Sequence, residues 1–380
     1  MRDLSRRTAI ILIDALGNEM ADRHGFSPES LPCRTRLRTV LGFSQAALTS
    51  ILTGSPPDEH GLWMMYSFCQ RRTPFGMLAT LRPFGGPDRL WVRNLLRWKL
   101  SRIDGISSYY SLYDIPGEVL HRLDLPARRS IFGRSGGGNR RSIIDEAYEG
   151  AGVFIRDYNT PEDQAFDELE SALERGETLF NLIYTAELDS DLHSYGPGDD
   201  AIGTRLMHYA ARIDSLVSRF PDVRFAVLGD HGMCEVKTRI DLISAVDAAG
   251  LRIQEDFIPF YDSTMARFHV RSVRAASVLS ALLNGTDGGR ILDNEELRSL
   301  GVYFPEGDYG DIVFLCDPGA IILPSYMSSD PVKGMHGYHP EAPCMDSVMF
   351  SSEEYGREEA SITAVATFLM PGFKGGERRR

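Results

Sequence analysis

The sequence predicts an α/β fold with a mostly parallel central sheet flanked by helices. Short apolar runs, rich in β-branched and aromatic residues and bounded by polar residues or glycine, recur along the chain as is typical of buried strands. Helical patterns lie between them, and strands that alternate with helices favour a parallel sheet. The runs expected as strands are Ala9–Ile13, Thr178–Tyr184, Arg224–Leu228 and Asp311–Leu315.

The helices follow from the spacing of apolar side chains. Pro161–Arg175 carries acidic residues in its first turn, where the partial positive charge of a helix N-terminus favours them, and apolar residues then recur at helical spacing. Ala201–Phe220 repeats that spacing. A further amphipathic pattern begins at Ser44 and ends at Gly54, and glycine is the residue type that most often ends a helix.

Two stretches depart from this alternation. Residues 66–140 carry an excess of basic and aromatic side chains. Residues 255–310 indicate a strand, a helix over Val273–Leu283 and a loop before the sheet resumes at Asp311. Ligands of open α/β sheets bind at the carboxyl ends of the strands, and we expect both stretches to be insertions that cap this edge. Residues 1–380 would then form one catalytic domain with two inserted caps.

Composition limits the class of protein. The chain is 43% hydrophobic and 25% charged, as globular proteins are. Its net charge of −12 argues against a general nucleic-acid binder, which needs a basic face. No apolar run approaches the ~20 residues of a membrane span. The five cysteines are odd in number and lack C-x-x-C spacing, so we expect neither a disulfide framework nor a cysteine zinc site. The N-terminal apolar run ends too early, at Asp14, for a signal peptide, and we expect a cytoplasmic protein.

Carboxylates and imidazoles follow three of the predicted strands. Asp14 comes directly after the first strand, and Asp230 and His231 follow the strand that ends at Leu228. Asp189 follows another strand, with His193 four residues later. The carboxyl ends of parallel strands meet at one edge of a sheet, and this set of oxygen and nitrogen ligands suits zinc or manganese. The sequence therefore predicts a metal site at that edge.

Ser44 is the candidate nucleophile. It opens a predicted helix, whose N-terminal N–H groups and partial positive charge suit a phosphate group. Serine is not acidic at neutral pH and needs a base or a metal to act as a nucleophile. A helix-capping role explains this serine equally well. The sequence around Ser44 is not a G-x-S-x-G motif, so this serine gives no support to an α/β-hydrolase.

Five motifs in order resemble the alkaline phosphatase superfamily, and within it the type I phosphodiesterase/nucleotide pyrophosphatase branch. They span residues 14 to 340, nearly the whole chain. The motifs are Asp14 in ILIDALG, Ser44 in GFSQAALTSILTGSPPDEHG, Asp189 and His193 in AELDSDLHSYGP, Asp230 and His231 in VLGDHGM, and His336 in GMHGYHP.

The resemblance implies an alkaline phosphatase-like fold and a division of the ligands between two metals. One divalent ion, zinc or manganese, would be held by Asp189, His193 and His336. The other would be held by Asp14, Asp230, His231 and the oxygen of Ser44. Two cations about 4 Å apart can stabilise both the attacking and the departing oxygen at phosphorus. The resemblance thus implies a hydrolase of phosphoric esters with a covalent phosphoseryl intermediate.

Some positions depart from the branch. Ala47 stands where diesterases usually carry an asparagine that holds a phosphoryl oxygen, Ser44 replaces their usual threonine, and His339 follows HGY in place of aspartate. Phosphodiester or pyrophosphate hydrolysis and phosphomonoester hydrolysis both stay open, as do a metal-dependent phosphomutase and a pseudoenzyme that binds a phosphorylated ligand. The sulfatase signature is absent around Ser44.

The first insertion supplies positive charge. The pattern of residues 88–103 predicts a helix with Trp91 and Trp98 among basic residues. This helix would present Arg93 and Arg97 to an anionic substrate. Alternatively, it would pack as a cap with a solvated basic face, or lie on an anionic membrane surface. Lys333 and His339 are further candidates for substrate contacts, because both lie close to His336 in the sequence. The expected partner is a small phosphorylated molecule, not a nucleic-acid polymer.

Overall fold

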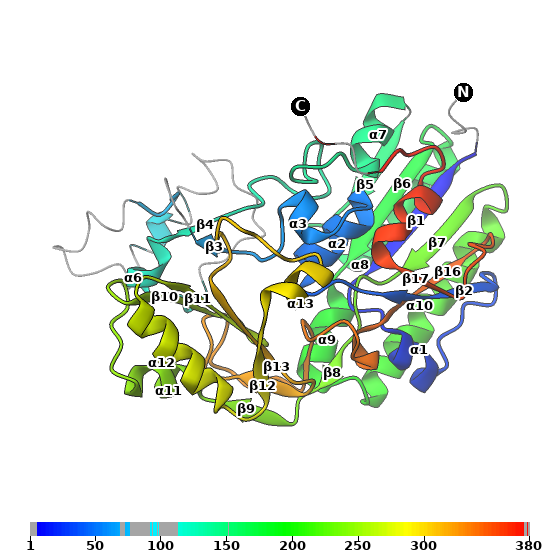
Figure 1. Ribbon diagram of the computed structural model, residues 1–380. Coiled ribbons are helices and arrows are strands. Elements are labelled where there is room, and N and C mark those ends of the chain that lie inside the picture. The colour runs from blue at the N-terminus through cyan, green and yellow to red at the C-terminus, as the bar shows by residue number, and fades with distance from the viewer. Residues whose placement is uncertain are drawn as a thin grey trace. The chain divides into compact units, whose positions relative to one another are not determined.

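The computed structural model describes residues 6–68, 73–76, 92, 94–96, 98, 113–150, 152–375 and 378. It divides into two compact units, drawn in Figure 1. The first unit consists of Met1–Gly61, Ile131–Glu235 and Val332–Arg380, and the second of Leu62–Ser130 and Val236–Pro331.

A seven-stranded sheet organises the first unit, in the order β17-β2-β16-β7-β1-β6-β5. Four of its six neighbouring pairs are parallel, and β16 runs antiparallel to both β2 and β7. The predicted α/β fold with a mostly parallel central sheet is therefore confirmed. The strands are β1 (Thr8–Ile13), β2 (Cys33–Arg38), β5 (Val153–Arg156), β6 (Phe180–Thr185), β7 (Arg224–Leu228), β16 (Ser347–Ser351) and β17 (Glu359–Ser361).

Helices flank this sheet (Figure 1). Alternate residues of β1 join one buried apolar cluster with side chains of α1, α8, α9 and α10, while α2 packs with α7, α14 and η3. The central strand β1 is buried along its whole length, as its continuous apolar run predicts. The helices are α1 (Asn18–His24), α2 (Ser44–Thr53), α3 (Pro57–His60), α7 (Ile143–Gly150), α8 (Glu162–Arg175), α9 (Glu187–Tyr195), α10 (Asp200–Arg219) and α14 (Ala366–Leu369), with 3-10 turns η2 (Pro343–Met345) and η3 (Ile362–Ala364). The two-residue strands β8 (Cys234–Glu235) and β15 (Gly334–Met335) pair antiparallel.

The second unit is built on a four-stranded antiparallel sheet in the order β10-β11-β13-β12. Its strands are β3 (Ser67–Phe68), β4 (Leu123–Asp124), β9 (Thr238–Ile240), β10 (Phe257–Tyr261), β11 (Met265–Val270), β12 (Gly289–Leu292), β13 (Ile312–Cys316) and β14 (Ala320–Ile322). Its helices are α6 (Gly117–Leu120), α11 (Leu242–Ala248), α12 (Val273–Asn284) and α13 (Asn294–Ser299).

One predicted strand belongs to a different sheet. The run Asp311–Leu315 does form a strand, β13, but it pairs antiparallel with β11 and β12 in the second unit, so the expectation that the central sheet resumes there is wrong. An apolar run shows that a strand is buried but not which strands it pairs with. The segment 255–310 also holds more strands than expected, namely β10, β11 and β12.

The predicted insertions 66–140 and 255–310 fall mostly within the second unit, whose segments are 62–130 and 236–331. Their role as caps stays a prediction. Among the described residues, no helix is both long enough and apolar enough to span a bilayer.

A disulfide joins Cys234 to Cys344 in the first unit. Sequence spacing gave no sign of this pair, because 110 residues separate the two cysteines. The expectation of no disulfide framework is therefore corrected by this one bond. Cys33 and Cys316 are free thiols.

Candidate active site

Four segments of the first unit bring the candidate residues together. Asp14 follows β1, and Asp230 and His231 follow the neighbouring parallel strand β7. Asp189 and His193 stand one turn apart on α9, which begins directly after β6. The remaining histidine, His336, follows β15.

The residues after β1 and β7 form one buried cluster. The Nε2 atom of His231 lies 3.3 Å from Oδ1 of Asp14 and 3.4 Å from Oδ2 of Asp230. The backbone N–H groups of Ala15 and His231 donate to Oδ1 of Asp230, at 3.1 and 3.0 Å. These donors fix one oxygen of Asp230 and leave the other directed at His231.

A second group surrounds Asp189. Its Oδ2 atom lies 3.3 Å from Nε2 of His193, and its Oδ1 atom lies 3.7 Å from Nε2 of His336. The rings of His231 and His336 stack with centroids 3.9 Å apart and planes 12° apart, which links this group to the first cluster. All six predicted ligand side chains therefore lie in one contiguous site.

Ser44 contacts the first cluster. It is the first residue of α2, and its Oγ lies 3.1 Å from Nε2 of His231 and donates to Oδ1 of Asp14 at 3.4 Å. The residue before it, Phe43, is extended and caps the helix without a side-chain hydrogen bond. Ser44 is therefore not the N-cap residue, and its hydroxyl is directed at the acidic cluster.

Charge is concentrated in this site. Burial, followed by repulsion from Asp230 and Asp189, raises the pKa of Asp14 well above its usual value. Burial also raises the pKa of Asp230. For Asp189 the effect of burial is outweighed by the hydrogen bond and charge of His193 and by His336, so its pKa is lowered. Carboxylates brought together in this way favour a cation between them.

Two backbone carbonyls set the orientation of the histidine rings. Nδ1 of His231 lies 3.0 Å from the carbonyl oxygen of Gly232, and Nδ1 of His193 lies 2.8 Å from that of Gly334. A carbonyl only accepts, so each Nδ1 carries a proton, and Nε2 is the nitrogen that a neutral ring would offer to a metal. Both Nε2 atoms are those that face the carboxylates, as metal ligation requires.

The donor set fits divalent metal ions. Ligand atoms of Asp14, Asp230 and His231 all lie within 4.8 Å of one another, and so do those of Asp189, His231 and His336. Oδ2 of Asp230 and Oδ1 of Asp189 are buried and accept no hydrogen bond among the described residues. Buried carboxylate oxygens normally have a hydrogen-bond partner, and a cation would satisfy both. The second group differs from the set implied by the resemblance, because it includes His231 where that set has His193.

Sequence reasoning missed Tyr184, the fifth residue of β6. Its hydroxyl donates to Oδ2 of Asp14, and the residue is buried. It also missed Thr39, whose hydroxyl donates to the backbone carbonyl of Asp230 at 2.8 Å. A tyrosine inside an apolar strand is typical of core packing, so no pattern in the sequence distinguishes its role.

Two of the four predicted substrate contacts, Lys333 and His339, lie in the described part of the chain. Lys333 is exposed, and its backbone N–H donates to the carbonyl of His193 at 2.9 Å. Nδ1 of His339 accepts from the backbone of Glu341 at 3.2 Å. Arg93 and Arg97 lie outside the described residues, as does most of 88–103. The substrate-binding roles of these four residues stay predictions.

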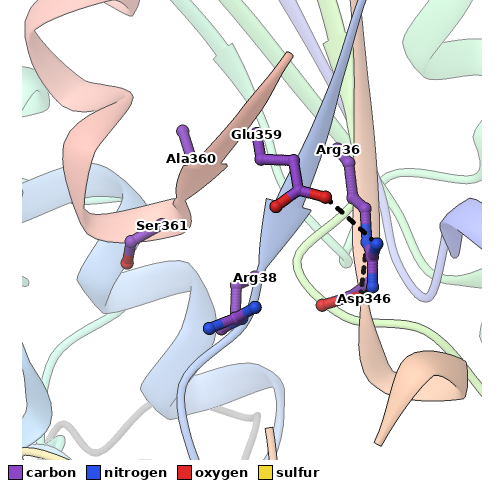
Figure 2. A pocket seen from close by; sticks show the side chains of 6 residues that line it. All are labelled: Arg36, Arg38, Asp346, Glu359, Ala360 and Ser361. Carbon is purple, nitrogen blue, oxygen red and sulfur yellow. Dashed lines mark hydrogen bonds and ion pairs between the residues drawn. The ribbon is translucent and has the colours of Figure 1, made fainter. Parts of the chain in front are cut away.

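Figure 2 shows a pocket at another place in the first unit, beside β2 and β17. Arg36 donates to Glu359 at 3.1 Å and to Oδ2 of Asp346 at 2.7 Å there. None of the candidate ligands or Ser44 lines it. The lining residues are Arg36, Arg38, Asp346, Glu359, Ala360 and Ser361.

Comparison with known proteins identifies a family and a fold. The family model described as type I phosphodiesterase/nucleotide pyrophosphatase matches residues 43–339. Murine ectonucleotide pyrophosphatase/phosphodiesterase 5 superposes with a TM-score of 0.67 at 14% identity, covering 96% of this chain and 94% of that chain.

Two further solved structures are similar. An inactive variant of the murine protein in complex with AMP also gives a TM-score of 0.67 at 14% identity, with coverage of 96% and 94%. The human protein gives 0.66 at 12% identity, again covering 96% of this chain and 94% of that one. At these identities the likeness shows the fold. A search of curated proteins finds no match.

Proposed function

Because the chain belongs to the type I phosphodiesterase/nucleotide pyrophosphatase family, which makes it a hydrolase of phosphoric ester bonds, we propose that it cleaves a small phosphorylated metabolite or nucleotide with Ser44 as nucleophile. One observation carries the proposal. Ser44 is the first residue of a buried helix, and its Oγ lies within 3.4 Å of both Oδ1 of Asp14 and Nε2 of His231. A serine that only capped the helix would have no reason to face a carboxylate and an imidazole.

Two sets of side chains would hold divalent metal ions, and we propose zinc, with manganese as the alternative. Asp14, Asp230, His231 and the oxygen of Ser44 form one set. The other consists of Asp189, His193 and His336, with His231 close enough to contribute. When bound, the two cations would supply positive charge for the attacking and departing oxygens and lower the pKa of the attacking group.

Ser44 would carry the covalent step. Its Oγ gives up its proton, attacks phosphorus and forms a new P–O bond. The bond to the leaving group breaks, and its electron pair stays on the departing oxygen, which takes up a proton. Water then cleaves the phosphoseryl ester and regenerates the hydroxyl. The N-terminus of α2 favours negative charge on Oγ and on the phosphoryl oxygens.

Nucleotide diesters or pyrophosphates are the substrate class that we propose. The family name and the AMP complex of the murine relative support a nucleotide. Ala47, on the first turn of α2, offers no amide to a phosphoryl oxygen, so we expect weak discrimination between diesters and monoesters. The capping role of residues 66–140 and 255–310 stays a prediction, and so does the cytoplasmic location of the protein.

A paired assay tests this function. The zinc-loaded protein is given bis-p-nitrophenyl phosphate and p-nitrophenyl phosphate, and the ratio of the two rates separates diesterase from monoesterase. Ser44→Ala should lose at least about 10³-fold in turnover with metal content near that of the wild type. Unchanged turnover in this variant excludes the covalent mechanism, and the absence of both activities in the metal-loaded wild type contradicts hydrolysis of simple esters.

A further inference from the structure

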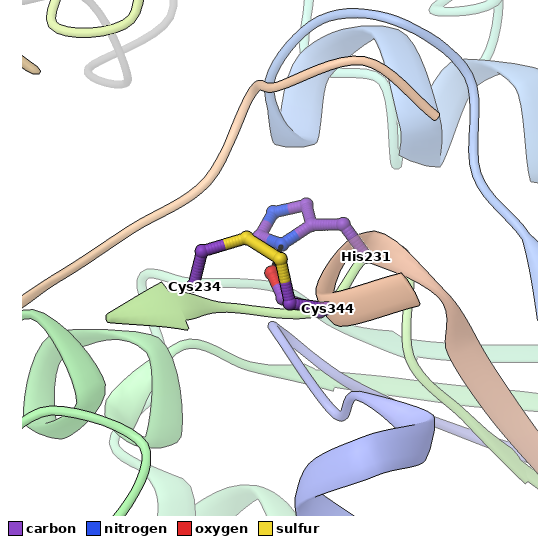
Figure 3. The surroundings of a disulfide bond; sticks show 4 residues. His231, Cys234 and Cys344 are labelled. Carbon is purple, nitrogen blue, oxygen red and sulfur yellow. Dashed lines mark hydrogen bonds between the residues drawn. A yellow bond between two sulfur atoms is a disulfide. The ribbon is translucent and has the colours of Figure 1, made fainter. Parts of the chain in front are cut away.

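The Cys234–Cys344 disulfide lies beside the candidate metal ligands. Figure 3 shows it next to His231, which precedes Cys234 by three residues. Cys234 pairs across the β8–β15 ladder with Met335, the residue before His336. Cys344 lies in η2, where the N–H of Gly232 donates to the carbonyl of Met345 at 2.9 Å. The bond therefore joins the segment after His231 to the segment after His336.

Sheet pairing holds the outer flanks of these two segments, because β16, which follows the second, pairs with β7, which precedes the first. The chain leaves the first unit after Glu235 and returns at Val332, so the whole second segment of the other unit separates them in sequence. Their described backbone links are the two-residue β8–β15 ladder and the bond from Gly232. Short, isolated strand pairs are weak in water. The disulfide is the covalent link between them within the first unit.

Residues 232–235 and 334–345, the stretches that the disulfide joins, contact every histidine of the site. The carbonyl of Gly232 accepts from His231, and the carbonyl of Gly334 accepts from His193. The third histidine, His336, follows β15 and stacks on His231. A shift of one segment relative to the other would therefore change the positions of all three imidazole rings at once.

We propose that the Cys234–Cys344 disulfide is a redox-sensitive clamp that positions His193, His231 and His336 for metal binding. The inference rests on the proposed function, since it assumes that these residues hold metal. A dithiol reductant would transfer two electrons and two protons to the disulfide and become a cyclic disulfide itself. Cys344 is half-buried and offers the reductant the more open side, because Cys234 is buried. The reduced site would keep its ligands but lose their fixed spacing.

Zinc affinity tests the clamp without measuring catalysis. Three forms of the protein are titrated with Zn²⁺ against a chromophoric chelator. They are the oxidised wild type, the dithiol-reduced wild type and the double variant Cys234→Ser/Cys344→Ser. The dithiol is first removed under argon because it binds zinc. The double variant lacks the released thiols, which excludes their own zinc binding as an explanation. Cys33→Ser, at a half-buried free cysteine, is the matched control.

We expect the reduced protein and the double variant to bind Zn²⁺ about 10- to 100-fold more weakly, the range seen when groups that orient metal ligands are removed. The far-UV circular dichroism spectrum should not change, reoxidation should restore affinity in the wild type alone, and Cys33→Ser should match the wild type. Affinities within twofold of the oxidised protein overturn the clamp. Global unfolding on reduction overturns it too, since the bond would then stabilise the fold as a whole.

The two proposals fail separately. If zinc affinity follows the redox state but no phosphoric ester is hydrolysed, the clamp stands and the hydrolase mechanism falls. If esters are hydrolysed but zinc affinity ignores the redox state, the mechanism stands and the clamp falls.

Discussion

His60 provides a quantitative test of the packing that holds the nucleophile helix. It ends α3 and is fully buried, with Nε2 3.0 Å from Oγ of Ser50 on α2 and a hydrogen bond to the backbone of Ala46. Burial, with a smaller contribution from the nearby charge of Arg140, lowers the pKa of His60 to about 3. The imidazole therefore stays neutral in the folded protein at any ordinary pH.

The cost of this burial depends on pH. In the unfolded chain an imidazole has a pKa near ~6.5 and takes up a proton as the pH falls, while His60 in the folded protein does not until about pH 3. The folded pKa is the lower one, so the contribution to stability is complete above pH ~6.5 and is lost as the pH decreases toward 3. At pH 5 the difference corresponds to about 1.5 pK units, or about 2 kcal/mol at ~1.36 kcal/mol per unit.

Replacement of His60 by glutamine isolates this effect. At pH 8 we expect His60→Gln to be less stable by about 1–3 kcal/mol, because a buried hydrogen bond is lost or distorted. When the pH is lowered from 8 to 5, the free energy of unfolding should fall by about 2 kcal/mol more in the wild type than in the variant, because the variant has no imidazole at this position. Urea unfolding at both pH values, in chelator, measures the two differences, and His208→Gln at an exposed site is the control. An equal loss in wild type and His60→Gln would refute the reasoning.

Three further predictions concern the metal ligands. Tyr184→Phe removes the hydroxyl that donates to Asp14, and zinc affinity measured by chelator competition should fall about 10- to 100-fold with the fold intact; an unchanged affinity contradicts this role. The raised pKa of Asp14, caused by burial and then by Asp230 and Asp189, means that the metal-free protein loses stability as the pH rises from the ordinary carboxyl pKa toward the raised one, because the unfolded chain ionises first. In chelator, Asp14→Asn should therefore lose less thermal stability than the wild type between pH 5 and pH 8, and parallel curves disprove the assignment. Each zinc ion, at about 100 times its Kd, should stabilise the wild type by about 2.7 kcal/mol, and an equal total stabilisation in Asp189→Asn would show that zinc binds elsewhere.

Strands of the central sheet were predictable where both faces are buried. The predicted run Arg224–Leu228 coincides with β7, and Ala9–Ile13 falls within β1, because both strands are buried along their whole length and apolar after their first residue. By contrast, β2 has the sequence CRTRLR, in which charged residues alternate with buried ones, and no apolar run marks it. Its pairing with β16 joins segments some 310 residues apart, which local periodicity cannot reveal.

The candidate site was predictable for a related reason. A parallel sheet gathers the ends of its strands at one edge, so residues after β1, β6 and β7 could be grouped from sequence alone. The groups that orient those residues could not. Tyr184 resembles a core residue, the carbonyls of Gly232 and Gly334 carry no side-chain signal, and the partner of Cys234 lies 110 residues away.

The site destabilises the folded protein, and this destabilisation indicates that the site binds a cation. Ala15 adopts φ of 60°, in the left-handed region that a side chain disfavours by roughly 1–2 kcal/mol. This turn directs its N–H to Asp230 and keeps Asp14 beside it. Burying two mutually repelling carboxylates adds a further penalty, seen in the raised pKa that burial and Asp230 give Asp14. Neither feature helps the sheet to form, and apolar residues at the same positions would make it more stable. Strain and repulsion concentrated at one point mark a functional site, and a divalent ion is the ligand that offsets both charges.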